Sequence, residues 1–188
     1  MILSTGFDKE SLKILKRKKN LRIIDTSKFR YKNHVSVKSF DGSFLIQDKN
    51  NKMVKRKELK CVTKLKPSRQ ELAQIEFAFN ICKYVKSNAI VLSNNFSTIG
   101  IGGGQPSRVD SCKIAIQKAR KFQPKKISKA IAASDAFFPF TDGLELLVKA
   151  GVKIVIQPGG SIKDKEIINY ANKAKIKMLF TGIRHFYH

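Results

Sequence analysis

The chain has 188 residues and a formal net charge of +24, with 38 Lys and Arg against 14 Asp and Glu. This length suits one sizeable hydrophobic core and is short for two. No apolar run is long enough to span a membrane and no signal-peptide pattern opens the sequence, so we expect a cytoplasmic protein with no membrane partner. The three cysteines are far apart and odd in number, which predicts buried reduced thiols and argues against disulfides or zinc: Cys61, Cys82 and Cys112.

The positive charge would ordinarily indicate nucleic acid or an anionic membrane as the partner. Only eight of the 38 basic residues are Arg, however. The basic residues are also scattered through nearly every segment and do not form a single tail. The abundance of Lys, Ile and Asn also resembles the imprint of an AT-rich genome. We therefore expect no specific nucleic-acid partner, only adhesion that salt removes, and a basic nucleic-acid-binding module stays the less favoured alternative.

The first third of the chain predicts a helix, a strand and a hairpin. The helix extends from an N-cap at Asp8 to about residue 19, and residues 21–24 form a strand. Strands 35–40 and 44–47 flank Asp41-Gly42-Ser43, a hairpin signal. Aromatic side chains among the basic ones suggest either stacking on bases or packing in a sheet core, and we favour packing: Phe29, Tyr31, Phe40 and Phe44.

From residue 67 onward, helices and strands alternate. Ser68 and Glu71 have the spacing of a capping box at the start of a long helix. Further helices are expected at 107–122, 142–150 and 164–175, and strands at 89–92, 98–101, 129–133, 152–156 and 177–180. This alternation predicts an α/β fold whose sheet has a parallel portion covered by helices. Ligands of such folds collect at the carboxyl ends of the strands.

Four glycines in residues 100–104 follow one predicted strand, and Arg108 begins the next helix. Glycine permits close backbone approach, a helix N-terminus attracts anions, and the guanidinium of Arg108 suits a carboxylate or phosphate. A tight strand-to-helix turn with a solvent-facing Arg explains the pattern equally well. The glycine spacing matches neither the phosphate loop nor the dinucleotide fingerprint.

Two other loops carry unusual residues. Segment 135–142 places three Phe between two Asp, which indicates either a flat ligand or subunit covering them or inward packing of all three rings. Arg184, His185 and His188 close the chain and suggest an anion contact, although a terminal His is usually solvated. Zinc-dependent deamination needs a His-x-Glu and a Pro-Cys-x-x-Cys motif, and the sequence has neither.

Five motifs together closely resemble one family. Residues 83–90, 100–111, 134–143, 157–161 and 181–188 are similar, in order and spacing, to the C-terminal part of the bifunctional purine-biosynthesis enzyme AICAR transformylase/IMP cyclohydrolase. The likeness covers nearly the whole chain. It implies a single transformylase lobe over 1–188, without the cyclohydrolase domain or the first transformylase lobe. The implied fold is a cytidine-deaminase-like three-layer α/β/α sandwich with a mixed sheet and no zinc site.

The resemblance implies formyl transfer from 10-formyltetrahydrofolate to AICAR, in the synthesis of IMP. An aromatic platform suits a planar heterocycle and a guanidinium suits a phosphate. Carried over motif by motif, the residues that contact AICAR are Asn88, Phe137, Arg184 and His188. Those that contact the folate are Arg108, Val109, Phe137, Pro139 and Asp142.

The sequence departs from the family in two ways. Gly103 stands where Ala is common, which we expect to loosen the turn, and Pro106 stands where Met is common. The family's catalytic Lys-His pair lies in the preceding lobe, so we assign no catalytic residue here and expect no cyclohydrolase activity. A complementary lobe, or a second copy in a homodimer, is expected to complete the site. The alternative is a truncated and inactive remnant.

Overall fold

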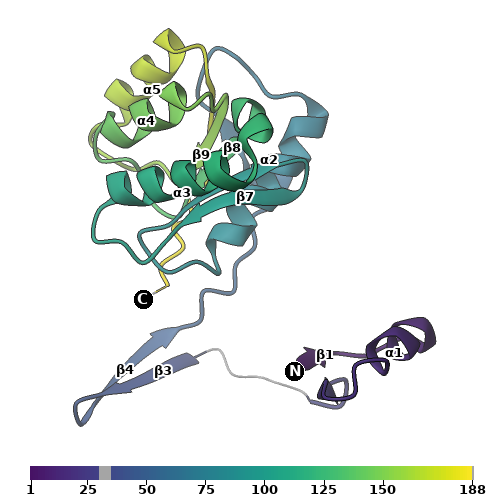
Figure 1. The fold of residues 1–188 in the computed structure, drawn as a ribbon. Helices are drawn as coiled ribbons and strands as arrows, with labels where there is room; N and C mark the ends of the chain where they lie inside the picture. Colours follow the sequence, from purple (N-terminus) through teal and green to yellow (C-terminus); the bar gives the residue numbers. More distant parts are fainter. Residues whose placement is uncertain (30–34, 188) are drawn as a thin grey trace. The chain divides into compact units, whose positions relative to one another are not determined.

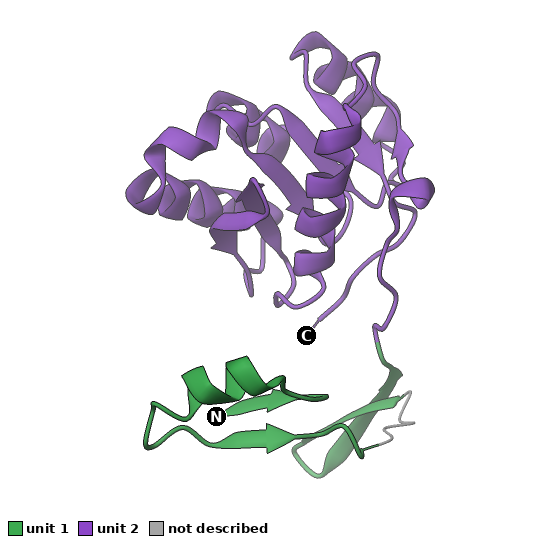
Figure 2. Ribbon diagram, turned by 90° about the vertical axis from the view of Figure 1, so that its right-hand side faces the viewer, with its two compact units in different colours: residues 1–49 green, residues 50–188 purple. Residues whose placement is uncertain are grey.

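A computed structural model describes residues 1–29 and 35–187, in two compact units, Met1–Lys49 and Asn50–His188 (Figure 2). The assignment of the whole chain to a single lobe stays a prediction. Figure 1 shows the elements of each unit in chain order. No described helix has the length and apolar character needed to cross a membrane.

The first unit is held by local pairing. Strand β1 (Ile2–Ser4) runs parallel to β2 (Ile23–Asp25), and β3 (Val35–Phe40) pairs with β4 (Ser43–Asp48) as the predicted hairpin. The helix α1 (Lys9–Leu15) begins at the predicted N-cap but ends earlier than residue 19.

None of the described residues of the first unit is buried. Phe29, Phe40 and Phe44 are 73%, 62% and 70% exposed, so the prediction that they pack in a sheet core is wrong. Tyr31 lies outside the described residues. A two-stranded hairpin with no covering layer buries too little apolar surface to supply a core, which explains the difference.

The second unit is built on a six-stranded mixed sheet in the order β5-β10-β9-β8-β6-β7. Strands β8, β9 and β10 are parallel neighbours. The other pairs are antiparallel: β5 with β10, β8 with β6, and β6 with β7. The strand bounds are β5 Lys60–Cys61, β6 Ile90–Asn94, β7 Ser97–Gly102, β8 Ile131–Ser134, β9 Ile154–Gln157 and β10 Lys177–Phe180. The predicted α/β fold with a mixed sheet is confirmed, and the short strands β1 and β5 were not predicted.

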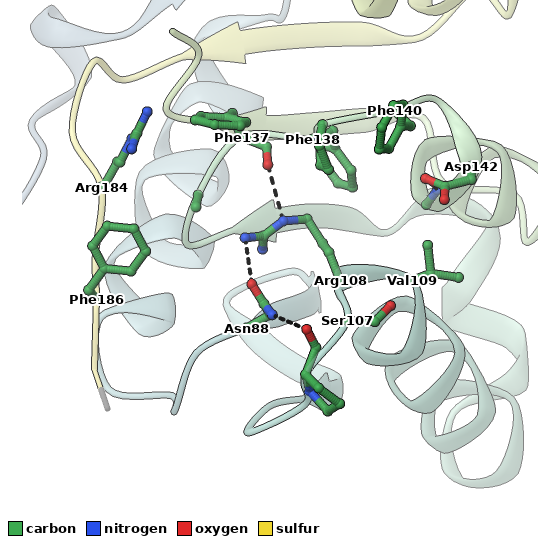
Figure 3. A pocket seen from close by; sticks show the side chains of 14 residues that line it. Asn88, Ser107, Arg108, Val109, Phe137, Phe138, Phe140, Asp142, Arg184 and Phe186 are labelled. Carbon is green, nitrogen blue, oxygen red and sulfur yellow. Dashed lines mark hydrogen bonds between the residues drawn. The ribbon is translucent and has the colours of Figure 1, made fainter. Parts of the chain in front are cut away.

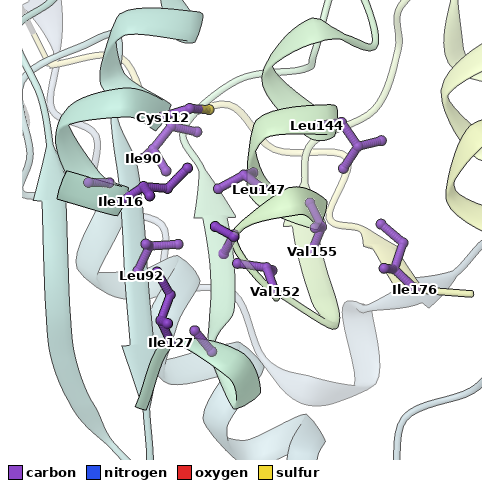
Figure 4. Close-up of a cluster of buried hydrophobic side chains, with 14 of the residues drawn as sticks. Ile90, Leu92, Cys112, Ile116, Ile127, Leu144, Leu147, Val152, Val155 and Ile176 are labelled. Atoms are coloured by element: carbon purple, nitrogen blue, oxygen red, sulfur yellow. The ribbon is translucent and has the colours of Figure 1, made fainter. Parts of the chain in front are cut away.

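Helices cover both faces of this sheet. Successive strand residues point to opposite faces, so Ile90 and Leu92 join one core (Figure 4) while Val91 joins the other. The first core lies under α3 (Arg108–Phe122), α4 (Asp142–Lys149) and α5 (Asp164–Lys173), and the second under α2 (Arg69–Cys82). Short 3₁₀ turns occur at Arg56–Glu58 and Pro124–Lys129.

Two of the helices begin where the sequence predicts. The hydroxyl of Ser68 accepts from Glu71 N–H, and the Glu71 carboxylate accepts from Ser68 N–H, which completes the capping box. Ser107 is the N-cap of α3. The cap at Ser107 lies at the cavity edge, whereas the Ser68 cap lies at the opposite edge, where Glu71 pairs with Lys177 at the start of β10.

The glycine-rich end of β7 serves packing against α3. A Cβ atom at Gly100 would collide with the carbonyl oxygen of Ala115, and one at Gly102 with the carbonyl oxygen of Ser111. Both obstacles are helix backbone and have no room to move. At Gly103 the nearest obstacle to a Cβ is a methyl group of Val85, a side chain, and the carbonyl oxygen of Lys86 is farther, at 3.1 Å.

We expect Gly102→Ala to lower the free energy of unfolding by about 1–3 kcal/mol or more, because the strand must move away from α3. Gly103→Ala is the matched control, and we expect it to cost less, because its nearest obstacle is a side chain and not helix backbone. Urea denaturation followed by circular dichroism measures both. Equal losses in the two variants would contradict the packing explanation.

Candidate functional site

The chain converges at one edge of the sheet. Strands β8, β9 and β10 are parallel and end there, and β6, which is antiparallel to β8, begins there. Ile90 stands opposite Ser134 in this pairing, so Asn88 reaches the same edge as the loop that follows β8. The loops enclose a cavity of about 490 Å³ (Figure 3), within the size range of small-molecule sites.

The cavity brings together the residues predicted to bind the two substrates. All of the described ones line it: Asn88, Arg108, Val109, Phe137, Pro139, Asp142 and Arg184. His188, also predicted, lies outside the described residues. The convergence of these residues is confirmed, and their binding roles stay predictions.

Arg108 is not the solvent-facing side chain of the simpler interpretation. Its side chain is 9% exposed and its Nη1 donates to Asp135 Oδ1 at 2.6 Å and to Ser134 Oγ at 3.0 Å. Its Nε donates to the carbonyl of Phe137 at 3.1 Å, and its Nη2 to Asn88 Oδ1 at 2.9 Å. Four of its five N–H donors are therefore used inside the protein, which leaves one for a ligand.

Asn88 links the glycine-rich turn to the cavity. Its Nδ2 donates to the carbonyls of Gln105 at 3.0 Å and Pro106 at 3.2 Å. Its own carbonyl accepts from Ser111 Oγ at 2.7 Å. The turn is thus fixed by internal partners, and its geometry is set before any ligand arrives.

The three Phe of the loop after β8 divide between the two predicted arrangements. Phe138 points inward and is 1% exposed, and its N–H donates to Gln157 Oε1 at 2.8 Å. Phe137 and Phe140 line the cavity. The guanidinium carbon of Arg184 lies 4.4 Å from the centre of the Phe137 ring, a cation–π distance. Figure 3 shows Arg184 and Phe186 on the same stretch of chain, beside Phe137.

Sequence reasoning missed three residues of this site. Asp135 is fully buried and pairs with Arg108, Gln157 holds the loop backbone, and Phe186 lines the cavity. Asp135 directly follows an apolar strand, and an acid at that place was the available signal. Gln157 and Phe186 lie within the motifs at 157–161 and 181–188, but no role was predicted for either.

His185 points away from the cavity, contrary to the expectation of an anion contact. It is fully buried, its Nδ1 lies 2.9 Å from Asn50 Oδ1, and its ring centre is 4.8 Å from that of Phe79. Burial and the charge of Lys83 lower its pKa to about 4, against an opposing effect of Asp135. The ring is therefore neutral near pH 7.

The buried thiols are not poised as nucleophiles. Burial raises the pKa of Cys82 well above its usual value and that of Cys112 to about 12, and a thiol is reactive as the thiolate. Cys61 is free and only partly buried. Among the described residues, no group of three or more His, Cys, Asp or Glu side chains could hold a metal ion.

Comparison with known proteins identifies the family. A family model described as the AICARFT/IMPCHase bienzyme matches residues 1–118. The chain belongs to this family. Its relatives include the bifunctional purine biosynthesis protein PurH of Aquifex aeolicus, 43% identical over 188 residues, and that of Prochlorococcus marinus strain MIT 9312, 47% identical over 189 residues.

These matches cover 100% of this chain and 36% of each relative. PurH of Staphylococcus carnosus, 42% identical over 191 residues, gives a similar share, 37%. The chain thus spans little more than a third of the length of these AICARFT/IMPCHase proteins. Its expected place at their C-terminal end stays a prediction.

The low pKa of His185 predicts a pH dependence of stability for this member of the AICARFT/IMPCHase family. The folded pKa, about 4, is below the reference value of 6.5, so between these values the unfolded chain binds a proton that the folded chain does not. Lowering the pH from 6.5 toward 4 therefore reduces the free energy of unfolding, by up to about 1.4 kcal/mol per pH unit.

Denaturation midpoints in urea, measured from pH 7 to pH 5, test this expectation. His185→Asn keeps a hydrogen-bonding group beside Asn50 but cannot titrate, so its stability should fall less steeply over the same range. An unchanged slope would contradict the assignment of a neutral buried imidazole.

Proposed function

We propose that this chain carries the substrate-binding part of an AICAR transformylase, which transfers a formyl group from 10-formyltetrahydrofolate to AICAR. The observation that carries the proposal is the convergence of Asn88, Arg108, Phe137 and Arg184 on one cavity. In this proposal the lobe is the C-terminal part of the family's chain and has a cytidine-deaminase-like fold.

The cavity has the chemistry that these substrates need. Aromatic rings from two segments offer apolar faces to flat heterocycles: Phe137, Phe140 and Phe186. Arg184 is exposed beside them and supplies the charge that a phosphate requires. Asp142, at the start of α4, and Pro139 line the side that we assign to the folate.

The acid–base chemistry of the transfer is proposed to come from outside this cavity. Its described lining contains no His, Lys or Cys side chain, and its ionisable groups are Arg108, Asp142 and Arg184. General acid–base catalysis near neutral pH usually needs a group that titrates there. We propose that a complementary transformylase lobe, or a second copy in a dimer, provides the Lys-His pair, while this chain positions both substrates.

The test is calorimetric titration of the full chain with AICAR, alone and mixed with the rest of a PurH relative, together with an assay of formyl transfer in the mixture. Arg184→Ala should weaken AICAR binding by about 10- to 100-fold, because a charged hydrogen bond contributes about 1.5–3 kcal/mol. Arg120→Ala is the matched control, since it removes one exposed positive charge from the far end of α3.

We expect Arg120→Ala to bind AICAR as the unaltered chain does. Equal weakening in the two variants would show that overall charge, and not the cavity, attracts the ligand. No binding of AICAR or 10-formyltetrahydrofolate and no transfer, with or without the complement, would contradict the proposed function.

A further inference from the structure

The chain that follows β10 has no regular secondary structure but is fixed by backbone hydrogen bonds. His185 N–H donates to the carbonyl of Asp135 at 2.9 Å. Two residues later, the carbonyl of Tyr187 accepts from Ser87 N–H at 2.9 Å. The segment is therefore attached to both loops that it passes.

Side chains alternate along this segment. Arg184 and Phe186 are exposed and line the cavity, whereas His185 between them is fully buried and faces the protein. Successive side chains of a strand point to opposite sides, and the buried His185 between two cavity-lining neighbours follows the same alternation. The inward direction of the His185 side chain therefore goes together with the exposure of Arg184 and Phe186 at the cavity wall.

The surroundings of His185 specify an imidazole. Asn50 approaches Nδ1 at 2.9 Å, and the ring lies against Phe79. The buried Nε2 of His185 and the buried Oδ2 of Asp135 have no hydrogen-bond partner among the described residues. A purely apolar side chain would fill the volume but would leave Asn50 unpaired as well.

Asp135 connects the surroundings of His185 to Arg108, the second guanidinium group of the cavity. Its carboxylate holds Arg108, and its backbone carbonyl holds His185 N–H. Both guanidinium groups of the site therefore depend on the same loop residue. One, Arg108, is inside the protein, and the other, Arg184, reaches the solvent side over Phe137.

We propose that His185 is a positioning residue. Because its ring is held between Asn50 and Phe79, Arg184 stays over the ring of Phe137, and Phe186 stays at the cavity wall. The ligand that this arrangement favours is a flat heterocycle with an anionic group. That ligand assignment rests on the proposed function, whereas the positioning of Arg184 rests on the geometry alone.

The test compares His185→Phe, Asn50→Ala and Ile167→Val with the unaltered chain by NMR, and Arg184→Lys serves for signal assignment. Arg184 side-chain protons above an aromatic ring resonate upfield, and the Arg184→Lys spectrum assigns the Arg184 Nε–H signal. His185→Phe keeps an aromatic ring but loses the bond to Asn50, and Asn50→Ala removes the partner. Ile167→Val, a buried position on α5, is the control for a general loss of stability.

We expect His185→Phe and Asn50→Ala to lose the upfield shift of Arg184. Ile167→Val should keep this shift although its melting temperature falls to a similar value. AICAR affinity should fall at least tenfold in His185→Phe, with His185→Asn in between. An unchanged Arg184 signal in both His185→Phe and Asn50→Ala would overturn the proposal. Absence of AICAR binding by the unaltered chain with its complement would contradict the proposed function alone, because the NMR comparison decides the positioning role separately.

Discussion

The buried ion pair between Arg108 and Asp135 organises the candidate site. Removing two charges from water costs more than their attraction returns unless further hydrogen bonds satisfy them. Arg108 meets this condition through Ser134, Asn88 and the carbonyl of Phe137. The pair therefore draws the start of α3, the start of β6 and the loop after β8 into one arrangement.

That arrangement separates the structural residues of the cavity from those available to a ligand. Arg108 and Asn88 spend nearly all of their donors and acceptors on neighbouring loops. One N–H donor of Arg108 remains for a ligand, together with Arg184 and the aromatic rings that face the cavity. A site built in this way has its shape set in advance, which suits a reaction in which positioning two substrates supplies much of the rate.

Much of the second unit could be predicted from sequence because its signals are local. The capping box at Ser68, the helix expected at 107–122 and the alternation of apolar strands with helices lie within short stretches of chain. The loops gathered at one sheet edge followed from the parallel strands. Pairings that depend on tertiary structure could not be found: Asp135 with Arg108, Gln157 with the backbone of Phe138, and His185 with Asn50. For the glycines at 100 and 102, sequence left open a turn that approaches a ligand and a tight strand-to-helix turn, and the structure shows the backbone of α3 as the element that approaches them.

In the first unit the predicted helix, strand and hairpin are present, but the predicted packing of its aromatic residues is wrong. These elements have clear local signals, but no described residue of 1–49 is fully buried, so Phe29, Phe40 and Phe44 remain exposed. Pairing of strands without a covering layer gives little tertiary stability. The matched relatives are nearly three times as long as this chain.

A double-mutant cycle between Arg108 and Asp135 tests the central claim most directly. Free energies of unfolding would be measured for Arg108→Met, Asp135→Asn and the double variant. Each single change should cost about 3–5 kcal/mol, because it leaves the partner charge buried and unpaired. The double variant should cost clearly less than the sum, by about 0.5–3 kcal/mol. Losses that simply add would contradict the claim that this ion pair holds the site together.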